Sequence, residues 1–296
     1  MPLQGVTSPM RVEIKHPYLI VQNDKQNDSL FHIYNLTDKK LVGVFGRKGQ
    51  GPGEFTTPWL VQTYLSDLIV EDNHKFHHYE FDSLGHPVQK ESMEAQTVVS
   101  IVAEAAFIND SIFVVDERYT GPNLYKFNMN SEIPLKKFSY RTPNMIDFYA
   151  DPQMGYVVAN NKRIILCRGY KKEIEFMDTD FNLIKKISFE FDSPTEITGQ
   201  NQGDVNVSYD NAYLGEHYLY VSCIGTSWNE YYKRNTYGSI IEVYDLDGNP
   251  VARYTLNGRQ PIYFAVDEET YTLYGPGPDA NPEDNLLVYQ LKGLSK

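Results

Sequence analysis

Cysteine is almost absent from this sequence. Only Cys167 and Cys223 occur among 296 residues, and each lies in an apolar run with the character of a strand. Two cysteines cannot build a disulfide framework, so their number does not identify the redox compartment. We expect two buried free thiols rather than a disulfide bond.

Long apolar runs and an excess of basic residues are missing as well. No segment approaches the roughly 20 apolar residues of a membrane-spanning helix, and residues 1–5 lack the apolar core of a signal peptide. The 27 Lys and Arg residues are outnumbered by 39 Asp and Glu residues, and this net charge of −12 argues against a nucleic-acid partner. The acidity favours solubility. Either the protein is cytoplasmic, or an export segment has been removed from a precursor.

Amphipathic helices are also lacking, and a repeated β pattern takes their place. The clearest copy is 241–256, in which two alternating apolar strands flank the turn Asp247–Pro250. Matching strand positions recur about every 45–50 residues, with one longer interval before Tyr244. These positions are Tyr34, Phe81, Phe127, Met177, Tyr244 and Tyr289. Repeat four departs from the pattern because Phe181 stands where the template has Gly248.

Each repeat holds about four short antiparallel strands, which is typical of one propeller blade. We therefore predict an all-β, six-bladed β-propeller that forms a single domain over 1–296. Because the last repeat ends soon after its third strand, we predict that Gln4–Ser8 pairs with Leu286–Leu291 and closes the last blade. The predicted blades are 9–55, 56–95, 96–142, 143–192, 193–258 and 259–296 together with 1–8.

The fifth repeat is longer than the others. Its extra length falls mostly in 193–206 and 224–238, and the second insertion combines Trp228, Tyr231 and Tyr232 with basic residues. Long loops on a rigid scaffold commonly carry binding residues.

A glycine-rich stretch, Phe45–Phe55, invites comparison with phosphate-binding loops. No Lys-Ser or Lys-Thr pair ends it and no helix follows, so the sequence favours a tight connection between blades. The stretch 45–58 resembles the linker of an NHL-type repeat. Residues 245–251, 264–269 and 273–275 resemble the TolB-like six-bladed propeller proteins. That resemblance implies the propeller fold and exported bacterial proteins, many of them lipoproteins and mostly without assigned activity.

Metal and nucleophile motifs are weak. His77 and His78 point to opposite faces of a strand, so at most one can join His74, and we expect no metal site or cofactor. The stretch Asp245–Asn249 has the opening spacing of a calcium loop but lacks its later ligands, which favours a hairpin turn. No nucleophile elbow or triad spacing is present.

A second set of residues follows from the propeller prediction. The ends of the second strands and the connections between blades should converge on one face, where Arg would offer donors, and Trp and Tyr flat apolar surfaces. The alternative is an ordinary polar rim. The candidate residues are Arg47, Asp72, His74, Asp116, Arg118, Arg168, Tyr170, Trp228, Tyr231, Tyr232 and Arg234.

These observations predict a non-catalytic binding or scaffold protein whose partner is a protein, a peptide or a glycan. We expect a monomer with no nucleic-acid partner and no transmembrane segment. From the family resemblance we expect an extracytoplasmic location in the periplasm or at the cell surface, with a lipid anchor as an option on the precursor. The alternative is a calcium-dependent hydrolase similar to six-bladed lactonases, with oxygen ligands drawn from Glu13, Asp147, Asn160 and Asp267.

Overall fold

The computed structural model of the chain is built almost wholly from antiparallel strands. It describes residues 1–24, 28–94, 105–116, 123–142, 147–233, 240–256, 260–261, 263–277 and 286–294. The chain divides into two compact units, one formed by Met1–Ala95 with Gln260–Lys292 and the other by Gln96–Arg259 with Gly293–Lys296. Each unit holds three sheets, so the described residues form six blades.

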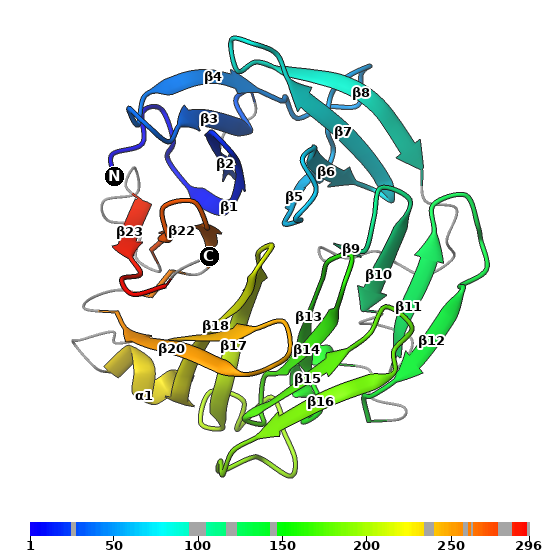
Figure 1. Ribbon diagram of the computed structural model, residues 1–296, viewed down its shortest axis with the longest axis vertical. Helices are drawn as coiled ribbons and strands as arrows, with labels where there is room; N and C mark the ends of the chain where they lie inside the picture. Colours follow the sequence, from blue (N-terminus) through cyan, green and yellow to red (C-terminus); the bar gives the residue numbers. More distant parts are fainter. Residues whose placement is uncertain are drawn as a thin grey trace. The chain divides into compact units, whose positions relative to one another are not determined.

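The first unit contains the blades nearest to the two ends of the chain. Its three sheets have the strand orders β1-β2-β3-β4, β5-β6-β7-β8 and β21-β22-β23, all antiparallel (Figure 1). The strands are β1 (Pro9–Lys15), β2 (Tyr18–Asn23), β3 (Phe31–Asn35), β4 (Leu41–Phe45), β5 (Trp59–Val61), β6 (Leu68–Asp72), β7 (Lys75–Phe81), β8 (Pro87–Glu94), β21 (Ala265–Asp267), β22 (Thr272–Pro276) and β23 (Leu286–Gln290).

The second unit contains the three middle blades, with strand orders β9-β10-β11-β12, β13-β14-β15-β16 and β17-β18-β19-β20. One short helix, α1 (Trp228–Lys233), and the 3-10 turn Phe148–Ala150 belong to this unit. Its strands are β9 (Ala105–Phe107), β10 (Ile112–Asp116), β11 (Asn123–Asn128), β12 (Lys136–Ser139), β13 (Gly155–Ala159), β14 (Ile164–Arg168), β15 (Glu173–Met177), β16 (Leu183–Ser188), β17 (Asn206–Leu214), β18 (Tyr218–Ser227), β19 (Ile240–Asp245) and β20 (Pro250–Thr255).

Burial follows the position of a strand within its blade. The second strands are fully apolar in their centres and buried, as in β14, whereas the fourth strands β16 and β20 alternate between exposed and half-buried residues. The apolar cores lie between neighbouring blades of one unit, where for example Ile165 and Phe176 of one blade pack with Val221 of the next. Cys167 and Cys223 are both buried in that core as free thiols, which confirms the prediction for them. Five four-stranded sheets and the three-stranded sheet β21-β22-β23 are the blades of an all-β propeller, as the sequence predicted.

A carboxylate closes the turn between the third and fourth strands in three blades. Asp245 accepts hydrogen bonds from the backbone N–H groups of Asp247 and Asn249 at 3.0 and 2.7 Å. Asp82 and Asp178 make the same bonds in their own turns. The side chain of Asn182 also donates to Asp178, and that of Asn249 to Asp245. Together with the backbone bonds, these donors hold the pKa of all three aspartates below the usual range.

The last blade is completed by the start of the chain. The Met1 ammonium group donates to the Leu286 carbonyl oxygen at 2.7 Å, and the Leu286 N–H donates to the Met1 carbonyl oxygen at 2.8 Å. The prediction of closure by Gln4–Ser8 was therefore wrong in its position. Gln4 and Gly5 form a turn, the Gln4 carbonyl oxygen accepts a hydrogen bond from Tyr34, and Ser8 bonds Asn23. The prediction of one domain over the whole chain stays a prediction.

Candidate functional site

The two insertions of the fifth blade fold against each other. In the first, the Thr198 N–H donates to the Asn201 side-chain oxygen at 2.7 Å, and the Gln202 N–H donates to the Thr198 carbonyl oxygen at 3.0 Å. The second insertion begins with α1, where the Asn229 N–H donates to the Gly203 carbonyl oxygen at 2.9 Å. The Asn229 side chain also donates to Asp204 at 2.7 Å. These bonds hold two loops of polar composition in one arrangement.

A buried apolar cluster anchors both insertions to the strands beneath them. It contains residues of the fourth and fifth blades together with two residues from the first insertion and three from the second. Its buried members are Met154, Tyr170, Ile197, Val207, Ile224 and Tyr231, with Ala150, Tyr156, Val205 and Trp228 half-buried against them. The cluster therefore fixes the insertions on a rigid support.

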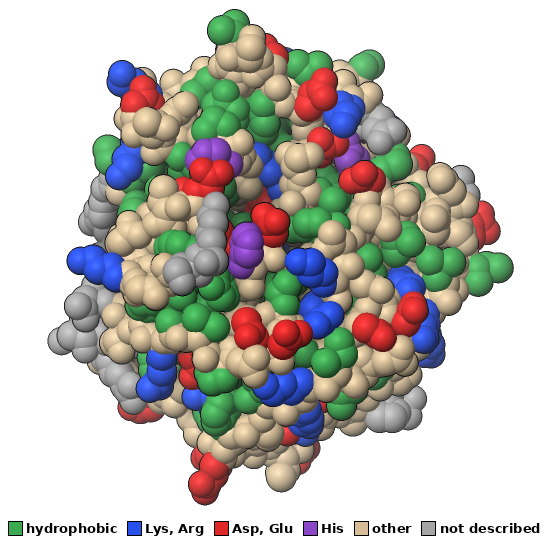
Figure 2. Space-filling view, in the orientation of Figure 1, with side chains coloured by type: hydrophobic (Ala, Val, Ile, Leu, Met, Phe, Trp, Pro, Cys, Tyr) green, Lys and Arg blue, Asp and Glu red, His purple; other side chains and the backbone are tan. Residues whose placement is uncertain are grey.

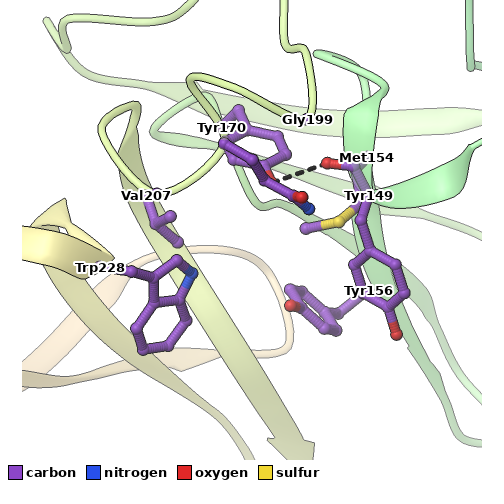
Figure 3. A pocket seen from close by; sticks show the side chains of 9 residues that line it. Tyr149, Met154, Tyr156, Tyr170, Gly199, Val207 and Trp228 are labelled. Atoms are coloured by element: carbon purple, nitrogen blue, oxygen red, sulfur yellow. Dashed lines mark hydrogen bonds between the residues drawn. The ribbon is translucent and has the colours of Figure 1, made fainter.

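A pocket of about 380 Å³ opens beside this cluster. Figure 3 shows Val207 and Trp228 on one side, Tyr149, Met154 and Tyr156 on the other, and Tyr170 between them. The lining consists of aromatic, apolar and small residues with a single amide. The full set is Tyr149, Met154, Tyr156, Tyr170, Gly199, Gln202, Gly203, Val207 and Trp228.

The three aromatic residues of α1 have different environments. Trp228 stacks on Tyr232 with ring centroids 5.8 Å apart and an interplanar angle of 22°, and Tyr231 meets Trp228 edge-on at 5.8 Å. Tyr231 is only 4% exposed, whereas Tyr232 is 60% exposed. Tyr231 is thus part of the support, and Trp228 and Tyr232 form an aromatic platform at the surface.

The hydroxyl group of Tyr170 is committed to a structural bond. The Tyr170 hydroxyl donates to the Tyr149 carbonyl oxygen at 2.8 Å. Burial raises the pKa of Tyr170 to about 12, and a hydrogen bond with Gln202 opposes that rise. Tyr170 therefore keeps its proton near neutral pH.

Of the eleven candidates from the sequence, four come together at this pocket or beneath it, namely Tyr170, Trp228, Tyr231 and Tyr232. Arg168 is nearby in sequence but is buried, where its guanidinium group bonds Glu175 at 3.0 Å and lies 4.8 Å from the Tyr140 ring. Asp116 is also buried and accepts the Tyr140 hydroxyl at 2.5 Å. Arg118 and Arg234 lie outside the described residues.

The other three candidates lie in the first unit, where each has a local structural role. Arg47 pairs with Asp28 at 3.0 Å, and Asp72 accepts hydrogen bonds from the N–H groups of Thr56 and Thr57. His74 occupies a tight turn with a φ of 68°, and its N–H donates to Glu71 at 2.8 Å.

The glycine-rich loop wraps a carboxylate of its own. The Gly51 N–H donates to Glu54 Oε2 at 2.9 Å, and a Cβ atom on Gly49 would lie 1.8 Å from that oxygen. The Phe55 N–H closes the loop on the Arg47 carbonyl oxygen at 2.8 Å. Gly49 therefore leaves room for the Glu54 side chain. This glycine has a structural role that does not require a bound phosphate.

Metal ligands do not gather within the described ranges, where no three His, Cys, Asp or Glu side chains lie close enough to hold an ion. His77 bonds Ser92 at 2.9 Å, whereas His78 is buried and faces Asp67 at 3.8 Å. The oxygens considered for calcium also have partners: Glu13 pairs with Lys15 at 2.8 Å, and Asn160 and Asp267 close turns.

Sequence reasoning missed most of the pocket. Tyr149 and Tyr156 lie outside the inserted segments, and no repeat pattern marks them. Gly199, Gln202 and Gly203 lie in the first insertion, which was recognised by its length but lacked aromatic residues to suggest a site.

Figure 2 shows acidic and basic side chains interspersed over the face that it draws. Among the described helices, none is long and apolar enough to cross a membrane.

Comparisons with known proteins support the fold. The structure of a member of the DUF4221 family from Bacteroides vulgatus is 14% identical, covers 98% of this chain and 94% of its own, and has a TM-score of 0.59. Chaetomium thermophilum Raptor is 11% identical over 97% of this chain and 28% of its own, with a TM-score of 0.54.

No curated protein matches the chain. Residues 3–269, by contrast, match the family described as TolB-like 6-blade propeller-like, a span that takes in strands of every blade from β1 to β21. With its six antiparallel blades and this match over most of its length, the chain belongs to the TolB-like six-bladed propeller family.

Proposed function

We propose that this protein is a non-catalytic binding module and that the pocket beside α1 is its ligand site. The observation that carries the proposal is the aromatic lining. Residues from the segment 149–156, the loop after β14, β17 and both insertions of the fifth blade line one cavity of about 380 Å³, and four of them are aromatic. Concave, mostly aromatic cavities with few polar groups are typical of ligand sites. The ligand is a protein segment, a peptide or a glycan.

The pocket lacks the groups of a hydrolase. Its nine lining residues include no Asp, Glu, His, Lys, Ser or Cys, so it holds neither a nucleophile nor a general base with a pKa near neutrality. The calcium-dependent alternative draws on inner-strand oxygens that already bond neighbouring groups. Binding is therefore the function that we favour.

The pocket can be closed without straining the backbone. A Cβ atom on Gly199 would meet open space, and Gly199 does not have a positive φ. We expect Gly199→Phe to fill the opening and to remove binding to arrays of defined peptides and glycans. Gln200→Phe is the matched control, because Gln200 is exposed, adjacent, and outside the pocket lining. Equal binding by both variants and the parent protein would contradict the proposed site.

We also propose an extracytoplasmic location and a monomeric state. The family match supports a location outside the cytoplasm. Fractionation of the native cells tests the location, and light scattering coupled to size exclusion tests the oligomeric state. Recovery of the protein in the cytoplasmic fraction alone would contradict the proposed location. A dimer that persists at low protein concentration would contradict the proposed monomeric state.

A further inference from the structure

The pocket surface is aromatic and uncharged. Its four rings belong to Tyr149, Tyr156, Tyr170 and Trp228, and its other side chains are Met154, Val207 and Gln202. None of the nine lining residues carries a formal charge at neutral pH. The face of an aromatic ring is the negative end of its quadrupole, so rings that turn their faces toward a cavity attract positive charge.

Two carboxylates lie next to the lining. Asp147 accepts a hydrogen bond from the Tyr149 N–H at 2.9 Å, and its charge contributes to raising the pKa of Tyr170 after burial. Asp204 follows Gly203 in the chain and accepts a hydrogen bond from Asn229, next to Trp228. Both carboxylates are held by residues at the pocket and disfavour an anionic ligand.

The basic groups nearest in sequence are already bound. Lys171 donates to the Gln153 side-chain oxygen at 3.0 Å, and Lys233 pairs with Glu230 at 2.9 Å. Neither lysine belongs to the lining. Lys171 bonds a neutral amide and keeps its charge, whereas Lys233 is paired with a carboxylate. The two aspartates against this one lysine leave a net negative charge beside the pocket, which favours a cation.

The lining side chains offer one amide, three phenol hydroxyl groups and one indole N–H, which are few for a ligand with many hydroxyl groups. Gln202 supplies the only amide side chain of the lining and already bonds Tyr170, whose hydroxyl group also donates to Tyr149. A buried hydroxyl group without a partner weakens binding, so a sugar ring that enters this cavity would lose more hydrogen bonds to water than it regains. A cation with methyl groups needs no such partners.

We propose that the pocket binds an alkylated ammonium group, held by cation–π attraction to the rings of Tyr149, Tyr156, Tyr170 and Trp228. This inference rests on the proposed binding function. Of the ligands named there it retains a protein segment or peptide and disfavours a glycan, and it adds a free quaternary amine. Trimethylammonium is the simplest group of this kind, since its charge is spread over methyl groups that also contact Met154 and Val207. It can belong to a small quaternary amine or to a methylated lysine side chain of a peptide.

Tryptophan fluorescence gives a direct test. The chain has two tryptophans, so Trp59→Phe leaves Trp228 as the only reporter. Choline is titrated against 3,3-dimethyl-1-butanol, which has the same shape without the charge. We expect saturable quenching by choline and binding of the neutral compound that is weaker by about tenfold, as expected for a partly desolvated cation–π site. Equal or tighter binding of the neutral compound would overturn the proposal.

A second arm separates the two sources of the group. Calorimetry compares choline with one peptide that carries either trimethyllysine or unmodified lysine. Tighter binding of the trimethyllysine peptide than of choline assigns the group to a protein partner, and the reverse order assigns it to a free amine. If none of the three binds, the proposal is wrong.

Matched variants test whether the preference for choline over the neutral compound arises at the pocket. Asp147→Asn and Asp204→Asn should weaken choline binding severalfold and leave the neutral compound unchanged, because only the field at the pocket changes. Tyr156→Leu keeps an apolar side chain and should lower the preference for the cation. Should the Gly199→Phe protein lose array ligands while choline never binds, the binding function stands and the cation inference falls.

Discussion

The ring of Phe181 stacks on the ring of Phe138 at a centroid separation of 5.7 Å and an interplanar angle of 26°, although Phe181 has a φ of 61°. The equivalent turns of two other blades have Gly85 and Gly248 at this position, with φ values of 83° and 73°. A phenylalanine in the left-handed region is strained by about 1 kcal/mol or more. The strain is offset because Phe181 joins the apolar core between the third and fourth blades.

At position 181 a glycine variant should be more stable than an alanine variant, whereas alanine is the more stabilising of the two at most positions. We expect both Phe181→Ala and Phe181→Gly to lower the free energy of unfolding by about 2–4 kcal/mol, because both remove the buried ring. Only Gly also relieves the strained backbone, so the Ala variant should be less stable than the Gly variant by about 1 kcal/mol. Urea unfolding measures the difference. Gly248→Ala is the companion variant, and it should destabilise because its new Cβ lies 3.0 Å from the Phe176 ring. A Gly variant less stable than the Ala variant would contradict this account.

The glycine-rich loop should show coupling between Gly49 and Glu54. Gly49→Ala places a Cβ 1.8 Å from Glu54 Oε2, so the carboxylate must leave and its bond to the Gly51 N–H is lost. We expect a loss of about 1 kcal/mol in the parent protein and almost none in a Glu54→Ala background. A double-mutant cycle measured by urea unfolding gives the coupling energy. Additive effects of the two substitutions would show that the carboxylate does not organise the loop.

Glu71 should make the protein less stable as the pH rises. Burial raises the pKa of Glu71 from 4.5 to about 7, and the charge of Asp72 adds to the rise, while the His74 N–H and Arg11 oppose it. The folded protein therefore binds this proton more tightly than the unfolded chain does. Its contribution to stability is fully present below about pH 4.5 and is lost as the pH rises through about 7, by at most about 3 kcal/mol.

Glu71→Gln tests this dependence, because the amide keeps an acceptor for the His74 N–H and cannot ionise. The variant should lose less stability than the parent between about pH 5 and about pH 8 in urea unfolding. Burial also raises the pKa of Asp210 to about 7, so the remaining slope should fall further in a Glu71→Gln, Asp210→Asn double variant. If the free energy of unfolding depends on pH in the same way in the parent and in Glu71→Gln, Glu71 is not the group that titrates.

The aromatic residues of α1 should separate into structural and surface roles. Tyr231→Ala should destabilise by about 3 kcal/mol, because its ring is 4% exposed and packs in the cluster beneath the pocket. Trp228→Ala with Tyr232→Ala should shift the melting temperature by only a few degrees and should abolish ligand capture. Thermal unfolding and binding to the arrays are measured on the same preparations. Unfolding of the Trp228, Tyr232 double variant would make the platform structural and remove it from the site.

The N-terminal residues should stabilise the last blade. Removal of residues 1–8 takes away the paired bonds between Met1 and Leu286 and the buried side chains of Leu3 and Val6, which are 2% and 1% exposed. We expect a loss of about 4 kcal/mol or more in urea unfolding. The Leu3→Ala, Val6→Ala double variant keeps the backbone bonds, so it isolates the contribution of burial. An unchanged midpoint for the deletion would mean that the strand pairing contributes nothing.

Much of the fold can be predicted from the sequence because strand alternation and turn residues depend only on residues close together in the chain. The alternation of Ile241, Val243 and their counterparts requires half-buried strands, and the Asp and Gly residues of the turn at 245–249 allow only a tight connection. Both features recur in successive repeats, so they predict antiparallel blades without reference to any distant contact. The same reasoning placed Phe181 at a glycine position and marked the fifth blade by its length.

Tertiary contacts decided what those patterns leave open. Arg168 and Trp228 both stood out as candidates, yet Arg168 is enclosed by Glu175 and Tyr140 while Trp228 borders the pocket. The start of the chain reaches Leu286 through Met1 rather than through Gln4–Ser8. Strand periodicity is a property of neighbouring residues and is therefore written in the sequence. Whether a polar or aromatic side chain faces a cavity depends on residues far away in the chain, such as Tyr149 and Gly199, and only the folded structure brings these together.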